Sequence, residues 1–279
     1  MSATRAGFIG LGSQGGPMAR RIVDAGLPLT LWARRPESVA PFADTAATVA
    51  STPAALAAAS DVVGICVVAD ADVEDVLLRP DGVLAGAAPG CVVALHATIH
   101  PDTCRRMAAA AAARGVALVD APVSGGAPAA AAGTLLVMAG GDEADIARCQ
   151  PVFETFADPV IRLGPVGSGQ MAKLMNNFVF TAQVGAALDT FTFAEGLGVD
   201  RAALAQVLAH GSGGSRAAGI IAATGFDTTG LASHAGLLHK DVGIILEVAR
   251  TRGATAPDAL LGLTEHALRL LGVSGDTTA

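Results

Sequence analysis

The chain has 279 residues, of which 52% are hydrophobic and 15% are charged, and its formal net charge is −7. This length allows two domains, and the negative charge, without any run of lysines or arginines, argues against nucleic acid and anionic membranes as partners. The low share of charged residues suggests that a partner subunit covers part of the surface.

Residues that the chain lacks exclude two classes of dehydrogenase. It contains no Tyr, which excludes enzymes that protonate the substrate oxygen with a tyrosine. The sequence also shows no ligand cluster for a catalytic zinc ion, so we expect no metal site. The acid of an oxidoreductase would therefore be Lys or His.

No stretch predicts a signal peptide or a membrane span. Glycines interrupt the apolar segment within residues 1–25, Arg20 and Arg21 close it, and the long uncharged runs at 121–141 and 174–188 are too polar or too rich in Gly and Pro. The cysteines form no Cys-x-x-Cys pair, and we interpret them as buried free thiols in a reducing compartment: Cys66, Cys91, Cys104 and Cys149. We therefore expect a cytoplasmic protein.

A Gly-rich turn follows the first predicted strand, at residues 6–10. The turn consists of Gly10, Leu11, Gly12, Ser13, Gln14 and Gly15, and a helical pattern continues to residue 25. This Gly-x-Gly-x-x-Gly between a strand and a helix is typical of dinucleotide binding, because the glycines let the pyrophosphate approach the amides at the helix N-terminus. The alternative is an ordinary Gly-rich turn.

The second predicted strand, at residues 29–33, is followed by two arginines. An NAD enzyme would carry an acidic residue here for the ribose 2′-hydroxyl, but the sequence has Arg34 and Arg35. Two guanidinium groups suit a 2′-phosphate, so we predict NADP rather than NAD. The alternative is two solvated arginines that open the next helix.

Strands then alternate with helices. We predict strands at 61–68, 91–95, 116–120, 135–139 and 159–163, and helices at 71–78, 100–114 and 143–153. This alternation indicates an α/β fold with a parallel, doubly wound sheet, in which ligands bind beyond the carboxyl ends of the strands. Val68 ends one of these strands, and we expect it to contact the cofactor.

Two turns at that edge carry polar side chains. In the first, Thr98 is placed to hydrogen-bond near a nicotinamide, and we hypothesise that His96 or His100 contacts substrate or nicotinamide; the alternative for each His is a structural role. In the second turn, Ser124 precedes two glycines, Gly125 and Gly126. A hydroxyl with two unobstructed amides suits a carboxylate, whereas the alternative is a plain Gly-rich loop.

The stretch 164–198 predicts one long helix that joins two domains, 1–163 and 164–279. Lys173 and Asn177 lie four residues apart and so on one helix face, where they could bind a small oxygenated substrate; the alternative is a solvated lysine. Further helices are predicted at 201–209, 237–250 and 259–271, with the turn 211–215 as a candidate lid. Lys240 and Asp241, taken alone, would be a solvated pair.

Four segments in order, GFIGLGSQGGPMA, DAPVSGG, GSGQMAKLMNN and HKDVGIILEVA, resemble the β-hydroxyacid dehydrogenase family, which includes 3-hydroxyisobutyrate dehydrogenases and semialdehyde reductases. The resemblance covers nearly the whole chain. It implies a Rossmann domain, a long connecting helix, an all-helical C-terminal domain, and homodimers or homotetramers.

The resemblance also implies residue roles. Lys173 would be catalytic, and Lys240 would lie close to the cofactor together with Thr98, with Asp241 packed beside them. Ser124, Gly125, Gly126 and Asn177 would surround a small, carboxylate-bearing substrate. The expected reaction is hydride transfer between NADP and a small β-hydroxyacid or its semialdehyde.

The chain departs from the family pattern at several positions. Gln14 stands where Met is usual, His96 replaces a common Ser, and the segment before Lys240 lacks the aromatic and basic residues of some members. The substrate therefore cannot be copied from a relative. Two alternatives remain, an imine reductase of the same fold and a non-catalytic NADP-binding module; both commonly lose the lysine that this chain keeps at Lys173.

Overall fold

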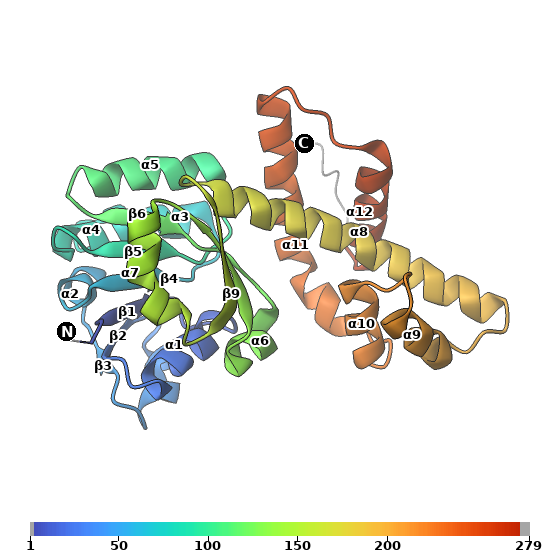
Figure 1. Ribbon diagram of the computed structural model, residues 1–279, viewed down its shortest axis with the longest axis horizontal. Helices are drawn as coiled ribbons and strands as arrows, with labels where there is room; N and C mark the ends of the chain where they lie inside the picture. The colour runs from blue at the N-terminus through green and yellow to red at the C-terminus, as the bar shows by residue number, and fades with distance from the viewer. Residues whose placement is uncertain (1–2, 274–279) are drawn as a thin grey trace. The chain divides into compact units, whose positions relative to one another are not determined.

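The computed structural model describes residues 3–273, and the chain divides into two compact units, Met1–Lys173 and Leu174–Ala279. The division falls inside helix α8 (Ser168–Gly196), which begins in the first unit and continues into the second (Figure 1). The prediction placed the domain boundary before Gly164. The structure instead gives the first turns of α8, including Lys173, to the first unit.

The first unit holds a doubly wound sheet with the order β3-β2-β1-β4-β5-β6-β8-β7, and β9 pairs with β8. The strands from β3 to β6 are parallel. Their bounds are β1 (Ala6–Ile9), β2 (Leu29–Trp32), β3 (Thr48–Val49), β4 (Val62–Ile65), β5 (Val92–Leu95), β6 (Ala117–Asp120), β7 (Val123–Ser124), β8 (Leu135–Gly140) and β9 (Ala157–Gly164).

The sheet is not parallel throughout, which corrects the prediction. β8 runs antiparallel to both β6 and β7. The residues between Ser124 and Leu135 are too few for the crossover of a dozen or more residues that a parallel pair needs. They form only the short helix α6 (Gly126–Ala132), which the sequence did not predict.

Helices cover both faces of this sheet (Figure 1). Alternate strand residues point to opposite faces, so Phe8 belongs to one buried cluster and Ile9 to the other. The helices of this unit are α1 (Gly15–Asp24), η1 (Pro36–Phe42), α2 (Pro53–Ala58), α3 (Asp70–Leu78), α4 (Val83–Gly86), α5 (Pro101–Ala112), α6 and α7 (Glu143–Phe153). Helices α1, α6 and α7 pack against the Phe8 cluster, and α2 to α5 against the Ile9 cluster.

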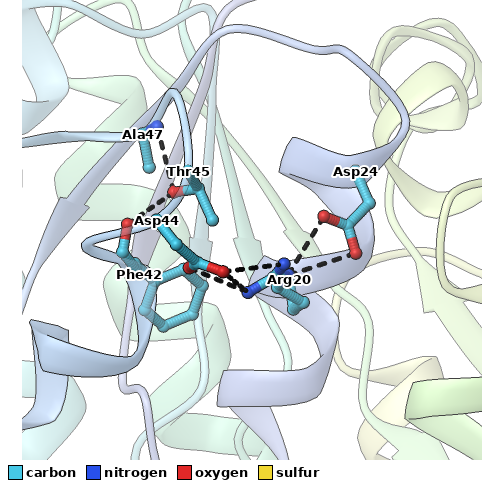
Figure 2. A network of polar contacts seen from close by, with 6 residues as sticks. All are labelled: Arg20, Asp24, Phe42, Asp44, Thr45 and Ala47. Atoms are coloured by element: carbon cyan, nitrogen blue, oxygen red, sulfur yellow. Dashed lines mark hydrogen bonds and ion pairs between the residues drawn. The ribbon is translucent and has the colours of Figure 1, made fainter.

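An arginine links α1 to the segment that follows η1. Arg20 donates hydrogen bonds to Asp24 on its own helix and to Asp44, at 3.0 Å and 3.1 Å (Figure 2). Beside it, Thr45 donates to the Phe42 carbonyl and accepts from the Ala47 amide. Arg20 is thus paired with two carboxylates and links α1 to the segment after η1.

The second unit is helical, as predicted. It holds the rest of α8 with α9 (Arg201–His210), α10 (Arg216–Ala223), α11 (Thr229–Thr251) and α12 (Asp258–Leu270). Val184, Ala217, Leu238 and Leu268 are buried in its core. Helix α10 and the first turns of α11 were not predicted, and the turn 211–215 ends at Ser215, which caps α10. Between residues 3 and 273 there is no helix long and apolar enough to cross a membrane.

Candidate active site

The turn after β1 fits the pyrophosphate of a dinucleotide. A Cβ atom on Gly10 would collide with the Cys66 carbonyl, and one on Gly15 would collide with the Gly10 carbonyl. By contrast, a Cβ atom on Gly12 would meet no atom within 4 Å. The outer glycines are therefore needed for the turn itself, whereas the middle one leaves open space where phosphate oxygens could approach the N-terminus of α1.

Three other predicted cofactor residues lie around this turn. Leu11 is half-buried and Ser13 is exposed. The Gln14 side chain has a buried Nε2 that finds no acceptor within residues 3–273, so it is available to a ligand. Val68 lies in the loop after β4, which ends at Ile65 rather than at residue 68, and it is 60% exposed.

Arg34 and Arg35 follow β2 and reach into solvent. The side chain of Arg34 is 77% exposed, and its Nη1 lies 3.3 Å from Asp72 Oδ1. Arg35 is similarly exposed, and its Nε lies 3.9 Å from Glu37 Oε1. Such exposed ion pairs contribute little free energy, so both guanidinium groups are free to rotate toward a phosphate.

The loop after β5 contains Thr98 between two histidines, and the Nδ1 atom of each histidine bonds the protein backbone. His96 is 3% exposed, its ring stacks on Phe8, and its Nδ1 donates to the Ala121 carbonyl over 2.8 Å. His100 is the N-cap of α5, where its Nδ1 accepts from the Asp102 amide. The Nε2 atoms of both rings are buried and find no partner within residues 3–273, so the hypothesis that one of these histidines contacts substrate or nicotinamide stays a prediction.

The Ser124 turn leads into α6 through two consecutive glycines with positive φ. Gly125 and Gly126 have φ values of 132° and 72°, which side chains rarely adopt. Ser124 ends β7 and is half-buried. The three residues follow β6 in the chain and lie beyond its carboxyl end, as Gly12 and Thr98 do for β1 and β5.

Lys173 lies in the second turn of α8 and is half-buried. The start of this helix is held by two side chains for which we predicted no role, Asp120 and Gln170. Asp120 accepts hydrogen bonds from the amides of Gly167 and Gln170, and the Gln170 side chain bonds the backbone of Ala97 and Ile99. Both residues occur in the quoted motifs, but their partners are distant in sequence.

In the second unit, Asn177 and Lys240 meet the same carboxylate. Asn177 Nδ2 donates to Asp241 Oδ2 over 2.6 Å, and Lys240 Nζ lies 2.9 Å from Asp241 Oδ1. Asp241 is 4% exposed and Asn177 is 9% exposed. A buried carboxylate needs such partners: Asp241 fixes the Asn177 amide by a hydrogen bond and forms an ion pair with Lys240. Among residues 3–273 no cluster of His, Cys, Asp or Glu could hold a metal ion.

Comparisons with known proteins cover both units. Residues 5–167 match a family described as the NAD binding domain of 6-phosphogluconate dehydrogenase, and residues 167–278 match one described as NAD-binding of NADP-dependent 3-hydroxyisobutyrate dehydrogenase. An NAD-dependent L-serine dehydrogenase from Pseudomonas aeruginosa is 34% identical over 272 residues, which cover 94% of this chain and 91% of the relative.

Solved structures agree with these matches. The structure of a Mycobacterium tuberculosis 3-hydroxyisobutyrate dehydrogenase with L-serine is 31% identical, covers 97% of this chain and 93% of its own, and superposes with a TM-score of 0.82. A reductive aminase from Aspergillus terreus, in complex with NADPH and ethyl-5-oxohexanoate, is 21% identical, covers 97% and 94%, and has a TM-score of 0.64. The latter likeness concerns the fold alone.

Proposed function

Because the chain belongs to the β-hydroxyacid dehydrogenase family and so is an NAD(P)-dependent oxidoreductase acting on CH–OH groups, we propose that it transfers a hydride between NADP and a small β-hydroxyacid or its semialdehyde. The observation that carries this proposal is the open space at Gly12, which lies in the same unit as the turn of Ser124, Gly125 and Gly126. The open space suits a pyrophosphate, and a hydroxyl followed by two glycine amides suits a carboxylate.

In the proposed reaction, Lys173 acts as the general acid in reduction and as the general base in oxidation. When bound, the nicotinamide supplies or accepts the hydride. As hydride reaches a carbonyl carbon, the Lys173 ammonium stabilises the negative charge that develops on the oxygen and then protonates it. In the oxidative direction the neutral amine takes the hydroxyl proton.

The other residues bind and orient. The Ser124 hydroxyl and the amides of Gly125 and Gly126 hold the substrate carboxylate, and Asn177 hydrogen-bonds the reacting oxygen. Thr98 and Lys240 contact the cofactor. Orientation of the two reacting carbons supplies much of the rate in such a reaction.

We favour NADP over NAD because Arg34 and Arg35 follow β2, where their guanidinium groups could bind a 2′-phosphate. No acidic residue takes the position that would bind a ribose 2′-hydroxyl, and both guanidinium groups are exposed beside the β2 end. We also propose a homodimer or homotetramer. Its support is the low charge and the exposed apolar side chains of the second unit, with Phe193 and Leu197 at 70% and 66% exposure.

Oxidation of NADPH and of NADH tests the proposal, with glyoxylate, succinic, methylmalonate and tartronate semialdehydes and a cyclic imine as substrates. We expect turnover of an acid-bearing aldehyde with NADPH. Lys173→Ala should lower kcat by about 10²- to 10⁴-fold while NADPH still binds. Lys173→Arg is the matched variant, because it keeps the positive charge but cannot release a proton at working pH.

Turnover of the imine alone would move the chain to the imine reductases. Tight NADPH binding without any turnover would indicate a binding module. Equal activity of Lys173→Ala and wild type would contradict the role given to this lysine.

A further inference from the structure

A buried carboxylate from the sheet caps the helix that carries Lys173. Asp120 ends β6 and is fully buried, at 0% exposure. Its Oδ1 accepts from the Gly167 amide over 2.7 Å, and its Oδ2 accepts from the Gln170 amide over 2.8 Å. An anion at a helix N-terminus satisfies amides that lack partners in the helix and interacts favourably with the helix dipole. Here the cap comes from a residue 47 positions away in the chain rather than from a neighbour.

Glycines allow this close approach. A Cβ atom on Gly169 would lie 2.9 Å from Asp120 Oδ2 and would collide with the Met138 carbonyl. A Cβ atom on Gly140, the β8 residue that pairs with Asp120, would collide with the same carboxylate. Asp120 is therefore packed closely between Gly140 of the sheet and Gly169 at the start of α8, and neither position has space for a larger side chain.

The Gln170 side chain makes a second connection, which we call the Gln170 clamp. Its Nε2 donates to the Ala97 carbonyl over 2.8 Å, and its Oε1 accepts from the Ile99 amide over 3.1 Å. Gln170 is fully buried, so water cannot replace these bonds. The clamp grips the backbone on both sides of Thr98.

Lys173 follows Gln170 by three residues on the same helix, so one turn separates the clamp from the amine. We propose that Asp120 and Gln170 are positioning residues, which fix Lys173 of α8 and the Thr98 segment after β5 at one mutual geometry. This inference rests on the proposed function, in which these two residues act on the reacting oxygen and the cofactor. Neither Asp120 nor Gln170 need touch a ligand.

Variants of Gln170 separate positioning from mere stability. Gln170→Met keeps the length of the side chain but removes both hydrogen bonds. We expect kcat to fall by about tenfold to a hundredfold, the cost of a small misplacement of a catalytic group, while the Kd for NADPH changes less than about threefold. Gln150→Met is the matched control, because the Gln150 amide on α7 donates to Glu154, four residues along the chain; it should behave as wild type.

Gln170→Glu adds a pH readout. The ionised carboxylate can still accept from the Ile99 amide but repels the Ala97 carbonyl, whereas the protonated acid again offers a donor. The kcat of this variant, relative to wild type at the same pH, should therefore recover as the pH falls. A kcat ratio that stays constant with pH would contradict the clamp.

The lysines give a readout that does not depend on turnover. Lys173 and Lys240 are the only lysines in the chain, so reductive ¹³C-methylation yields two side-chain signals, which Lys173→Arg and Lys240→Arg assign. Gln170→Met should shift the Lys173 signal and its titration midpoint, and leave the Lys240 signal unchanged. Unchanged Lys173 signals would overturn this inference, whereas wild type without any turnover would overturn the proposed function.

Discussion

Asn177 Nδ2 donates a 2.6 Å hydrogen bond to Asp241 Oδ2, so α8 and α11 are joined by a buried amide and carboxylate. The other oxygen of Asp241 lies 2.9 Å from Lys240 Nζ. The carboxylate thus fixes which way the Asn177 amide faces. If Asn177 binds the substrate oxygen, its orientation depends on Asp241.

We predict that Asp241→Asn lowers kcat/KM by about tenfold or more, since a displaced buried partner costs about 1–3 kcal/mol. The new amide keeps the shape but loses the charge that holds both Asn177 and Lys240. Steady-state kinetics with the preferred semialdehyde measures this. Asp189→Asn is the control, because Asp189 is an exposed residue of α8 that pairs with His266; a similar loss there would show that any carboxylate change in this unit harms activity.

Cofactor preference should depend on the arginines after β2. The double substitution of Arg34 and Arg35 by Ala is expected to raise the Kd for NADPH by about tenfold to a hundredfold, because charge-assisted hydrogen bonds to the 2′-phosphate are lost. The Kd for NADH should stay the same, as NADH lacks that phosphate. Fluorescence titration with both nucleotides gives the answer. Arg162→Ala, at an exposed pair with Glu143, should change neither constant, and an equal loss for NADH would contradict the assignment.

In the turn after β1, we predict different outcomes for alanine substitutions of Gly12 and Gly10. Gly12→Ala should leave thermal stability unchanged and abolish dinucleotide binding, since its methyl group meets no protein atom within 4 Å but fills the space left for the pyrophosphate. Gly10→Ala should lower the Tm, because its φ is 94° and its methyl group would collide with the Cys66 carbonyl. Thermal unfolding with and without NADPH distinguishes them. Gly236→Ala, in an open position of α11, is the control, and retained NADPH binding in Gly12→Ala would contradict the assignment of this space to the pyrophosphate.

Because His96 is buried, we predict that the first unit loses stability in acid. Burial lowers the pKa of His96 to about 4, below the value of about 6.5 in an unfolded chain. The unfolded state then binds more protons between these values, so stability is full above about pH 6.5 and falls as the pH drops toward 4. The loss is on the order of 3 kcal/mol at most.

Urea unfolding of wild type and His96→Phe at pH 7.0, 5.5 and 4.5 measures this loss. The stability difference between the two proteins should shift in favour of the variant as the pH falls. Burial raises the pKa of Asp120 to about 6, which works in the opposite direction, but this contribution is present in both proteins. A stability difference that is independent of pH would contradict this prediction, because it would mean that the pKa of His96 is the same in the folded and the unfolded chain.

Local patterns in the sequence were sufficient for much of the first unit. The strand, Gly-rich turn and helix around Gly12 were predicted because each is encoded by neighbouring residues. The antiparallel β8 was not, because direction depends on the length of the connection after Ser124. The start of α11 was missed since Gly230 and Gly236 lower helix propensity there, and tertiary packing overrides that preference.

The positions of the candidate site residues were easier to predict than their supports. Thr98, Ser124 and Lys173 follow strand ends or a helix start, which a linear pattern shows. The partners of Asp120 and Gln170 lie 47 to 73 residues away in the chain, and no local spacing encodes such contacts. The burial of His96 was equally hidden, because a histidine after a strand can face either the ligand or the core.

The Gln170 clamp binds only main-chain groups, and this has a consequence for sequence divergence. Substitution of Ala97, Thr98 or Ile99 changes a side chain but leaves the main-chain carbonyl and amide that hydrogen-bond to Gln170. Proline at position 99 is the exception, because it has no amide hydrogen. Related chains can therefore exchange the group carried at position 98, and with it the chemistry offered to a ligand, without losing the alignment of that segment with the lysine helix.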